Sequence, residues 1–471
     1  MGRFVPVDRQ TQYLLAPSVQ EWLPEDHLAR FVVEVLEQTD LGALERAYAG
    51  RGSAAHHPQV LLGLLVYGYA SGVFSSRAIE RATHDSVAFR YIAANTHPDH
   101  DTIASFRRRF GAQVREVFLQ VLLLAQQMKL LKLGTVALDG TKLKANASRH
   151  KALSLSHAER LEQQLSAEVN RLLARAERAD GQERRSQPMD LPGEIARREQ
   201  RLEAIRAAKA QIEQRAKERF EREQAAYEAK RQRRERQRQA GKKPRGVEPK
   251  PPEPGPRPKD QVNLTDADSR IMPVAGGGFD QAYNAQIAVD TESLLIVGTG
   301  LTHASVDQQQ LEPMLEQLET LPQSLGQVNA LLADAGYCSK TNVEACVQHQ
   351  VEPLIAMRRE QHHLGLEQRF AADAKPPALD ADSMIWMAWV LSTQQGRARY
   401  ARRKSTVEPS IGIIKRVMRF RQFLLRGLAK VSAEWNLVAL AYNLRRLCEL
   451  KLKRSRVGVG SGAPETMPMA C

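Results

Sequence analysis

The sequence predicts an α/β protein: a mixed sheet with flanking helices, preceded by an all-α N-terminal region and interrupted by a basic helical insert. Apolar residues recur at helical spacing from residue 18 to 130, and short apolar strands alternate with helices after residue 262. Between these regions, residues 151–260 hold 28 Lys/Arg, 19 Asp/Glu and two aromatic residues, which is typical of exposed helices. We therefore predict five parts: a helical region at 1–130, the first part of the core at 131–150, the insert with its Pro-rich linker at 151–260, the remainder of the core at 261–450, and a disordered tail at 451–471.

The N-terminal region contains a strongly basic helix. Asp101 or Thr102 is a suitable N-cap, and the helix that follows carries Arg107, Arg108 and Arg109 in succession. Short consecutive helices with a basic third member are typical of a helix-turn-helix, which lays one helix in the major groove of DNA. A plain helical bundle with a solvated arginine face explains the same pattern equally well.

Two apolar strands lead to an aspartate. The first runs from residue 133 to Asp139, and the second, from residue 327 to 333, is followed by Asp334. At the ends of two strands of one sheet these carboxylates can lie close together, where their repulsion raises each pKa and a divalent metal relieves it. Taken alone, the Asp-Gly dipeptide at 139–140 favours a turn, and Asp290 and Asp307 have ordinary roles at a hairpin turn and a helix cap.

The candidate third carboxylate is Glu408. Pro409 is tolerated only near the start of a helix, so we expect a helix to begin near Thr406 with Glu408 in its first turn. Glu408 and Lys415 then share one face of that helix. A capping box, in which Ser405 is the N-cap and Glu408 its partner, explains the glutamate without any chemistry.

Charge and composition indicate a soluble cytoplasmic protein that binds a polyanion. The chain has 68 Lys/Arg against 54 Asp/Glu, a net charge of +14 and a pI near 9.7, and nucleic acid is the commonest polyanion. The four cysteines form no zinc or disulfide pattern, and the N-terminus has no signal-peptide core. The run from Arg231 to Arg238 can contact a phosphate backbone, or it can form a solvated helix surface beside a flexible linker.

Several motifs, in the right order, resemble those of the DDE transposases of bacterial insertion sequences. They include Ala-Leu-Asp-Gly-Thr at 137–141, Ala-Asp-Ala-Gly-Tyr at 333–337, the helix around Glu408, the segments 420–428 and 434–446, and the N-terminal motif His-Asp-Thr-Ile-Ala…Phe-Arg-Arg. The resemblance runs from about residue 10 to 450. Lys404 and Lys415 have the family's spacing from Glu408, whereas Tyr400 and Arg403 stand one residue out of register.

Two residues depart from the family's pattern near this helix. Ser410 stands where the family usually has an aromatic residue after the Glu-Pro pair, and Arg419 stands where it usually has glycine. Neither position is a carboxylate, so the departures leave the candidate triad unchanged.

The resemblance implies a ribonuclease-H-like catalytic core and two Mg²⁺ ions, for which Mn²⁺ can substitute. It implies that Asp139, Asp334 and Glu408 are both the catalytic residues and the metal ligands. It also implies that Lys415, Lys404 and Arg403 hold DNA phosphates near the cleavage site, in addition to contacts expected from the three arginines of the N-terminal region.

The expected function is that of a transposase, which binds the ends of its own insertion sequence, hydrolyses phosphodiester bonds with Mg²⁺ and joins the freed strand to target DNA. Pairing two terminal inverted repeats requires at least a homodimer. Two alternatives remain: an inactive or domesticated DNA-binding protein, and a nuclease without strand transfer. A glycosidase is disfavoured, because aromatic residues make up 6% of the chain and do not gather near the three carboxylates.

Overall fold

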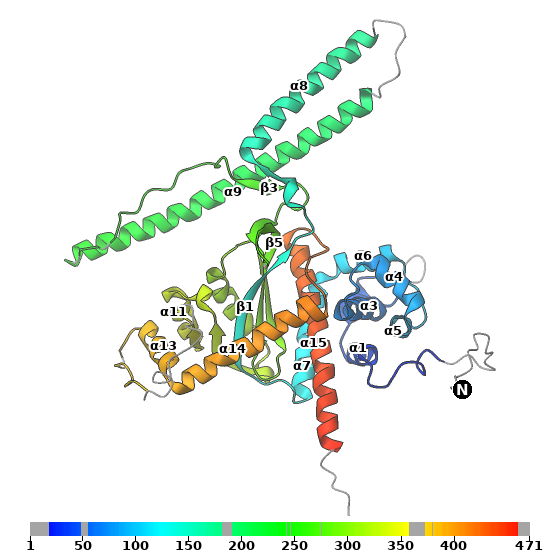
Figure 1. Ribbon diagram of the computed structural model, residues 1–471, viewed down its shortest axis with the longest axis vertical. Helices are drawn as coiled ribbons and strands as arrows, with labels where there is room; N and C mark the ends of the chain where they lie inside the picture. The colour runs from blue at the N-terminus through cyan, green and yellow to red at the C-terminus, as the bar shows by residue number, and fades with distance from the viewer. Residues whose placement is uncertain are drawn as a thin grey trace, which may run out of the picture. The chain divides into compact units, whose positions relative to one another are not determined.

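The computed structural model describes residues 18–48, 55–180, 191–241, 243–244, 246–274, 276–357, 373–378 and 380–459 (Figure 1). The chain divides into two compact units. The first comprises Met1–Leu143 and Tyr283–Cys471, and the second comprises Lys144–Ala282. The predicted tail begins within a helix, which continues to Val459, and residues 460–471 of that tail lie outside the described residues.

Short helices form the N-terminal part of the first unit, as predicted. They are α1 (Leu28–Glu37), α2 (Gly42–Arg46), α3 (Pro58–Ser71), α4 (Ser76–Asp85), α5 (Val87–Ile92), α6 (His100–Arg109) and α7 (Gly111–Gln127). The predicted N-cap of α6 was wrong by two or three residues. Asp99 caps this helix, because its carboxylate accepts a hydrogen bond from the backbone N–H of Thr102 at 2.8 Å.

A six-stranded mixed sheet forms the core, and its strands are β1 (Leu133–Lys144), β4 (Arg270–Pro273), β5 (Phe279–Asp290), β6 (Ile296–Thr302), β7 (Gly326–Ala333) and β8 (Glu352–Ile355). Hydrogen-bonded neighbours follow the order β4-β5-β1-β7-β8, and β6 also pairs with β5. The predicted hairpin of β5 and β6 is antiparallel, whereas β1–β7 and β7–β8 are parallel. The predicted alternation of strands and helices after residue 262 is therefore confirmed.

The helices of the second half flank this sheet. They are α10 (Leu311–Glu319), α11 (Lys340–Gln348), α13 (Ser383–Ser392), α14 (Gln394–Gly412) and α15 (Leu428–Val459), and a π-helix, Ile413–Val417, follows α14 directly. α15 packs against α7, α3 and β6, so one long helix joins the N-terminal helices to the sheet (Figure 1).

Buried polar contacts fix α15 in this position. The Glu434 carboxylate accepts hydrogen bonds from the Tyr69 hydroxyl at 2.6 Å and from the backbone N–H of Leu425 at 2.9 Å. Burial raises the pKa of Glu434, so these donors compensate for the desolvation of the carboxylate. The Asn443 side chain accepts a hydrogen bond from the backbone N–H of Ile296 at 2.9 Å and donates one to its carbonyl at 2.8 Å, so it pairs with β6 as a neighbouring strand would.

The second unit is built on a helical hairpin, as the heptad-like spacings predict. α8 (Leu155–Asp180) packs against α9 (Leu191–Gln239), and a two-stranded antiparallel sheet of β2 (Ala152–Ser154) and β3 (Gln261–Asn263) closes its base. Apolar side chains from both helices and both strands form its core, which includes Leu165, Ile205, Ile212, Leu153 and Val262.

Within the described ranges, no single helix has the length and apolar content needed to cross a membrane. α3 and α4, which meet at a bend of 95°, satisfy both criteria only as a pair.

Candidate active site

The parallel pairing of β1 and β7 brings two aspartates together. Ala137 of β1 pairs with Leu332 of β7, and Asp139 and Asp334 each stand two residues further along their strands. The two carboxylates interact, since Asp334 is among the charges that raise the pKa of Asp139. This register agrees with the expectation that the two aspartates lie close together in one sheet.

Asp139 lies within its strand and not at its end, which corrects the expectation from the sequence. β1 continues to Lys144, so the turn interpretation of the Asp-Gly dipeptide is also wrong. Asp334 does follow β7 directly, where it caps a short 3₁₀ turn by accepting a hydrogen bond from the backbone N–H of Gly336 at 2.8 Å.

The environment of Asp139 disfavours its charge. Burial raises the pKa of its carboxyl group to about 6, and the charge of Asp334 adds to that effect. The Arg403 guanidinium, 3.3 Å from the carboxylate, and the Gly140 backbone N–H at 2.8 Å both act in the opposite direction. The pKa of Asp139 therefore lies closer to neutral pH than that of an ordinary aspartate, as is common for groups in functional sites.

Helix α14 begins much earlier than the sequence predicts. Its N-cap is Thr393, whose hydroxyl accepts from the Gly396 N–H at 3.0 Å, and Pro409 lies inside the helix. The missing proline N–H leaves the carbonyl of Ser405 without its helical donor, but Ser405 is exposed, so water can replace that donor. Both the predicted helix start at Thr406 and the capping-box alternative are therefore wrong.

This longer helix separates the residues expected around the third carboxylate. Glu408 is exposed on α14, as is Lys404. Arg403, which stands out of register with the family's pattern, is 8% exposed and makes the ion pair with Asp139. The helix therefore places Arg403 against an aspartate of the candidate triad and leaves Glu408 accessible.

Lys415 lies in the π-helix that follows α14, and it reaches β1. Its ammonium group donates a hydrogen bond to the Thr141 hydroxyl. Burial lowers the pKa of Lys415, while the nearby Asp139 carboxylate raises it. A π-helical turn shifts the register of side chains within a helix and is frequent at functional sites.

A third aspartate also faces this site, which the sequence did not indicate. Asp307 does not use its side chain as a helix cap. Its carboxylate accepts hydrogen bonds from Lys142 at 3.0 Å, from Asn284 at 2.7 Å and from Gln286 at 2.8 Å. Asp290, by contrast, has the predicted turn role, since it accepts from the Ser293 N–H at 2.8 Å.

Tyr337 extends this network to the turn that follows Asp334. Its hydroxyl donates a hydrogen bond to the Gln286 side chain. Burial raises its pKa well above 10, and the charges of Asp307, Asp139 and Asp334 add to this effect. The tyrosine therefore stays neutral and lies among all three aspartates.

Gly140 makes this close packing possible. A Cβ atom added at this position would lie 2.3 Å from the Gln286 amide nitrogen and 2.6 Å from an Asp307 carboxylate oxygen. Neither side chain is free to move, because each is held by the hydrogen bonds described above. The Asp-Gly pair thus has a packing explanation and not a turn explanation.

The three arginines of α6 have different environments. Arg107 donates to the Phe74 carbonyl at 2.9 Å and to the Tyr69 hydroxyl at 3.2 Å, so it belongs to the contacts beneath α15. Arg109 donates to the Ala47 carbonyl at 2.7 Å, and its guanidinium lies 5.0 Å from the centre of the Phe110 ring. Arg108 is exposed and bonds only to Ser105 of its own helix in the described contacts.

The donor set of this site suits a divalent cation only in part. Two adjacent carboxylates that repel each other are ligands of the type that hard cations prefer, so Asp139 and Asp334 fit such an ion chemically. Across the part of the chain that the structure describes, however, no group of three or more His, Cys, Asp or Glu side chains is gathered closely enough to hold a metal ion. Glu408 is thus not assembled with the two aspartates.

Two family models match the chain. The transposase DDE domain matches residues 261–444, and a transposase domain of the DUF772 type matches residues 17–109. No curated protein and no solved structure gives a significant match. The chain belongs to the DDE transposases of insertion sequences. Residues 110–260, which include Asp139 and the helical insert, lie outside both matched ranges.

The packing around Gly140 gives a stability prediction. We expect Gly140→Ala to lower the free energy of unfolding in urea by about 1–3 kcal/mol, because the new methyl group overpacks a site with fixed neighbours. Gly134→Ala in the same strand is the matched control, since a Cβ there meets nothing within 4 Å. Equal stability of the two variants would contradict this explanation, because it would show that Gln286 and Asp307 move aside without a loss of stability.

The raised pKa of Asp139 gives a pH prediction. Its folded value, about 6, exceeds the ordinary value of 3.8, so the ionised carboxylate costs folding free energy that is absent below pH 4 and complete above pH 6. Relative to the wild type, Asp139→Asn should therefore gain about 1–3 kcal/mol of stability between pH 4 and pH 7. Urea unfolding in EDTA measures this difference.

Glu312→Gln, which changes an exposed carboxylate on α10, is the control for that pH series. A stability difference between Asp139→Asn and wild type that stays constant from pH 4 to pH 7 would contradict the assigned burial of Asp139.

Proposed function

We propose that this transposase binds the ends of its own insertion sequence and catalyses Mg²⁺-dependent phosphodiester hydrolysis followed by strand transfer into target DNA. The observation that carries the proposal is the adjacency of Asp139 and Asp334 on two parallel strands. The family assignment supports it independently, because the matched DDE domain is a transposase domain.

The catalytic core is proposed to be ribonuclease-H-like, with Asp139, Asp334 and Glu408 as the catalytic and metal-binding carboxylates. Asp139 and Asp334 would hold the divalent cation, and Glu408 would complete the ligand set from α14. Bound there, Mg²⁺ or Mn²⁺ supplies positive charge that stabilises the developing charges of the attacking and leaving oxygens. Two ions are expected in this class of site.

The residues of the chain itself would position the DNA. Lys415 brings a positive charge beside Asp139 and is proposed to hold a phosphate near the bond to be cut. Arg403 pairs with Asp139, and its positive charge opposes the rise in the pKa of that carboxyl group. Lys404 and, on α6, Arg108 and Arg109 are proposed as further phosphate contacts. Arg107 is less suited to that role, since its guanidinium is engaged with Phe74 and Tyr69.

The proposed partners are the terminal inverted repeats and the target duplex. Two ends must be brought together before strand transfer, so the active form is proposed to be a homodimer or a larger assembly. Because the DNA that flanks the coding sequence would contain these repeats, a plasmid that carries this locus is the natural substrate for an assay.

A second candidate is a DNA-binding protein without catalytic activity. One observation favours it: Glu408 is exposed and is not gathered with the two aspartates among the described residues. A nuclease that cuts without joining is a third outcome, which a strand-transfer assay on the same substrate separates from the first.

A cleavage assay distinguishes these candidates. We expect Asp139→Ala and Asp334→Ala to reduce Mg²⁺-dependent nicking of the plasmid by roughly a thousandfold or more, because both change groups that act together in the reaction. DNA affinity, measured in EDTA, should stay at the wild-type level. Glu312→Ala on the surface of α10 is the control and should retain full activity.

An active Asp139→Ala variant would remove this proposal. Glu408→Ala is informative separately: a loss of nicking as large as that of Asp139→Ala supports a triad. Full activity of Glu408→Ala beside an inactive Asp139→Ala would exclude Glu408 while keeping the two aspartates.

A further inference from the structure

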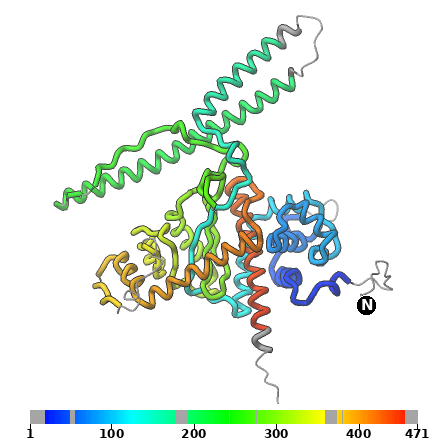
Figure 2. Tube along the Cα trace, in the orientation of Figure 1, coloured from blue at the N-terminus to red at the C-terminus, as the bar shows by residue number. Residues whose placement is uncertain are grey.

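The second unit carries a groove whose two sides come from different parts of the insert. α9 extends past the end of its contact with α8, and the chain then returns along this extension as a segment without regular structure, residues 243–244 and 246–260 (Figure 2). Side chains of α9 hold the returning segment by hydrogen bonds and an ion pair. Arg234 donates to the carbonyls of Gly246 at 3.2 Å and Val247 at 3.1 Å, and Arg219 pairs with Asp260 at 2.8 Å.

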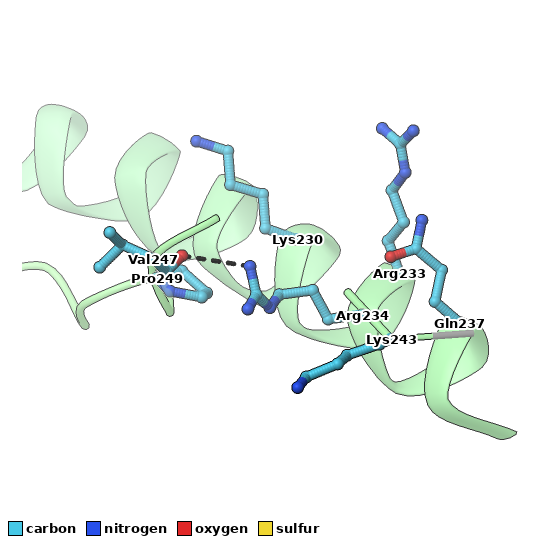
Figure 3. A pocket seen from close by; sticks show the side chains of 7 residues that line it. All are labelled: Lys230, Arg233, Arg234, Gln237, Lys243, Val247 and Pro249. Atoms are coloured by element: carbon cyan, nitrogen blue, oxygen red, sulfur yellow. Dashed lines mark hydrogen bonds between the residues drawn. The ribbon is translucent and has the colours of Figure 1, made fainter. Parts of the chain in front are cut away.

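The groove between α9 and the returning segment has a volume of about 870 Å³. Lys230, Arg233, Arg234 and Gln237 line it from the helix, and Lys243 lines it from the segment (Figure 3). Among the described residues that line it, none carries a carboxylate. The neighbouring acid of the segment, Glu248, is neutralised by an ion pair with Arg238.

The charge of this groove is not compensated within the insert. Lys230, Arg233 and Lys243 are exposed, and within the ranges that the structure describes none of the three has an ion-pair partner. Arg234 is committed to the backbone carbonyls, so it shapes the groove and adds positive charge to it. Three accessible cations and one fixed cation around an open groove form a site for an anionic ligand.

The spacing of the cations fits a row of phosphates. Lys230, Arg233 and Gln237 lie on one stripe of α9, three and four residues apart, and successive helix residues rise by about 1.5 Å. The stripe therefore spans roughly 10 Å, comparable to the distance covered by a few phosphates of one DNA strand at about 3.4 Å per step along the duplex. Lys243 faces the same space from the other side.

The insert has few aromatic residues, which argues against recognition of unstacked bases. Phe220 and Tyr227 are its aromatic residues between 151 and 260, and neither lines the groove. Proteins that bind single strands stack bases on aromatic rings, whereas contacts from lysine and arginine to phosphates need none.

We infer that this groove binds the phosphate backbone of duplex DNA independently of its sequence, through Lys230, Arg233 and Lys243. The inference rests on the proposed function, since it assigns the insert a DNA contact apart from the aspartate site. It concerns residues outside both matched family ranges. An acidic peptide is the alternative ligand that the same charges could hold, and the experiment includes it.

The test is the salt dependence of DNA binding by the full chain. A fluorescent duplex of arbitrary sequence is titrated in EDTA between 50 and 300 mM NaCl, with wild type and with the triple variant Lys230→Gln, Arg233→Gln, Lys243→Gln. Each lost phosphate contact should reduce the slope of log K against log [salt] by about 0.9, so we expect a slope shallower by about 2 to 3.

A matched control removes the same charge elsewhere on the insert. Arg171→Gln, Arg201→Gln, Lys217→Gln changes three exposed cations of α8 and α9 that do not line the groove. This control should keep the wild-type slope, and circular dichroism should show the same helix content for all three proteins.

The outcomes separate the two proposals. If wild type binds no duplex, both the proposed function and the groove are overturned. If wild type binds and the groove variant keeps its slope, or if the control falls equally, the groove is overturned while the proposed function stands. Binding of fluorescent polyglutamate to wild type but not to the groove variant, with an unchanged duplex slope in that variant, would assign the groove to acidic peptides instead.

Discussion

The parallel pairing of β1 with β7 is the constraint on which the candidate active site depends. It places Asp139 beside Asp334 although the two residues are far apart in the chain, and the fold must then accommodate two carboxylates in a partly buried position. The cost appears as a raised pKa on Asp139. Positive charges beside this carboxylate come from an arginine of α14 and from a lysine of the following π-helix. The electrostatics of the site thus follow from the burial of Asp139 together with the strand order that brings Asp334 beside it.

The polar residues around the aspartates fix their positions through rigid contacts. Gln286 links Tyr337 to Asp307, and Gly140 supplies the space that this link requires. α15 also holds β5, since the Trp435 indole donates a hydrogen bond to the Gln286 backbone carbonyl at 3.0 Å. The motifs at 434–446, which the sequence associates with the family, therefore act in large part through packing. Arg419, one of the two positions that depart from the family's pattern, has a structural explanation in the backbone. Its φ of 60° is a left-handed conformation that glycine adopts more easily.

Much of the fold could be predicted because its signals are local. Apolar periodicity identified the N-terminal helices, the hairpin of the insert and the strands that lead to the two aspartates. Local rules failed where distant contacts decide the structure. Pro409 does not begin a helix because α14 is already capped at Thr393. Asp307 does stand at the predicted N-cap position, but its side chain makes no capping bond because Lys142, Asn284 and Gln286 bind it. Nothing in the sequence near Arg107 shows that Tyr69 and Phe74 engage it.

The proposed joint binding of a divalent cation by Asp139 and Asp334 is tested most directly by Mn²⁺ binding, measured by the EPR signal of the free ion. At pH 8, with duplex DNA present, we expect Asp139→Asn and Asp334→Asn each to weaken Mn²⁺ binding by about tenfold or more. The double variant should bind no more weakly than the weaker single variant, because both side chains act on one ion. Wild-type affinity in either single variant would contradict the account.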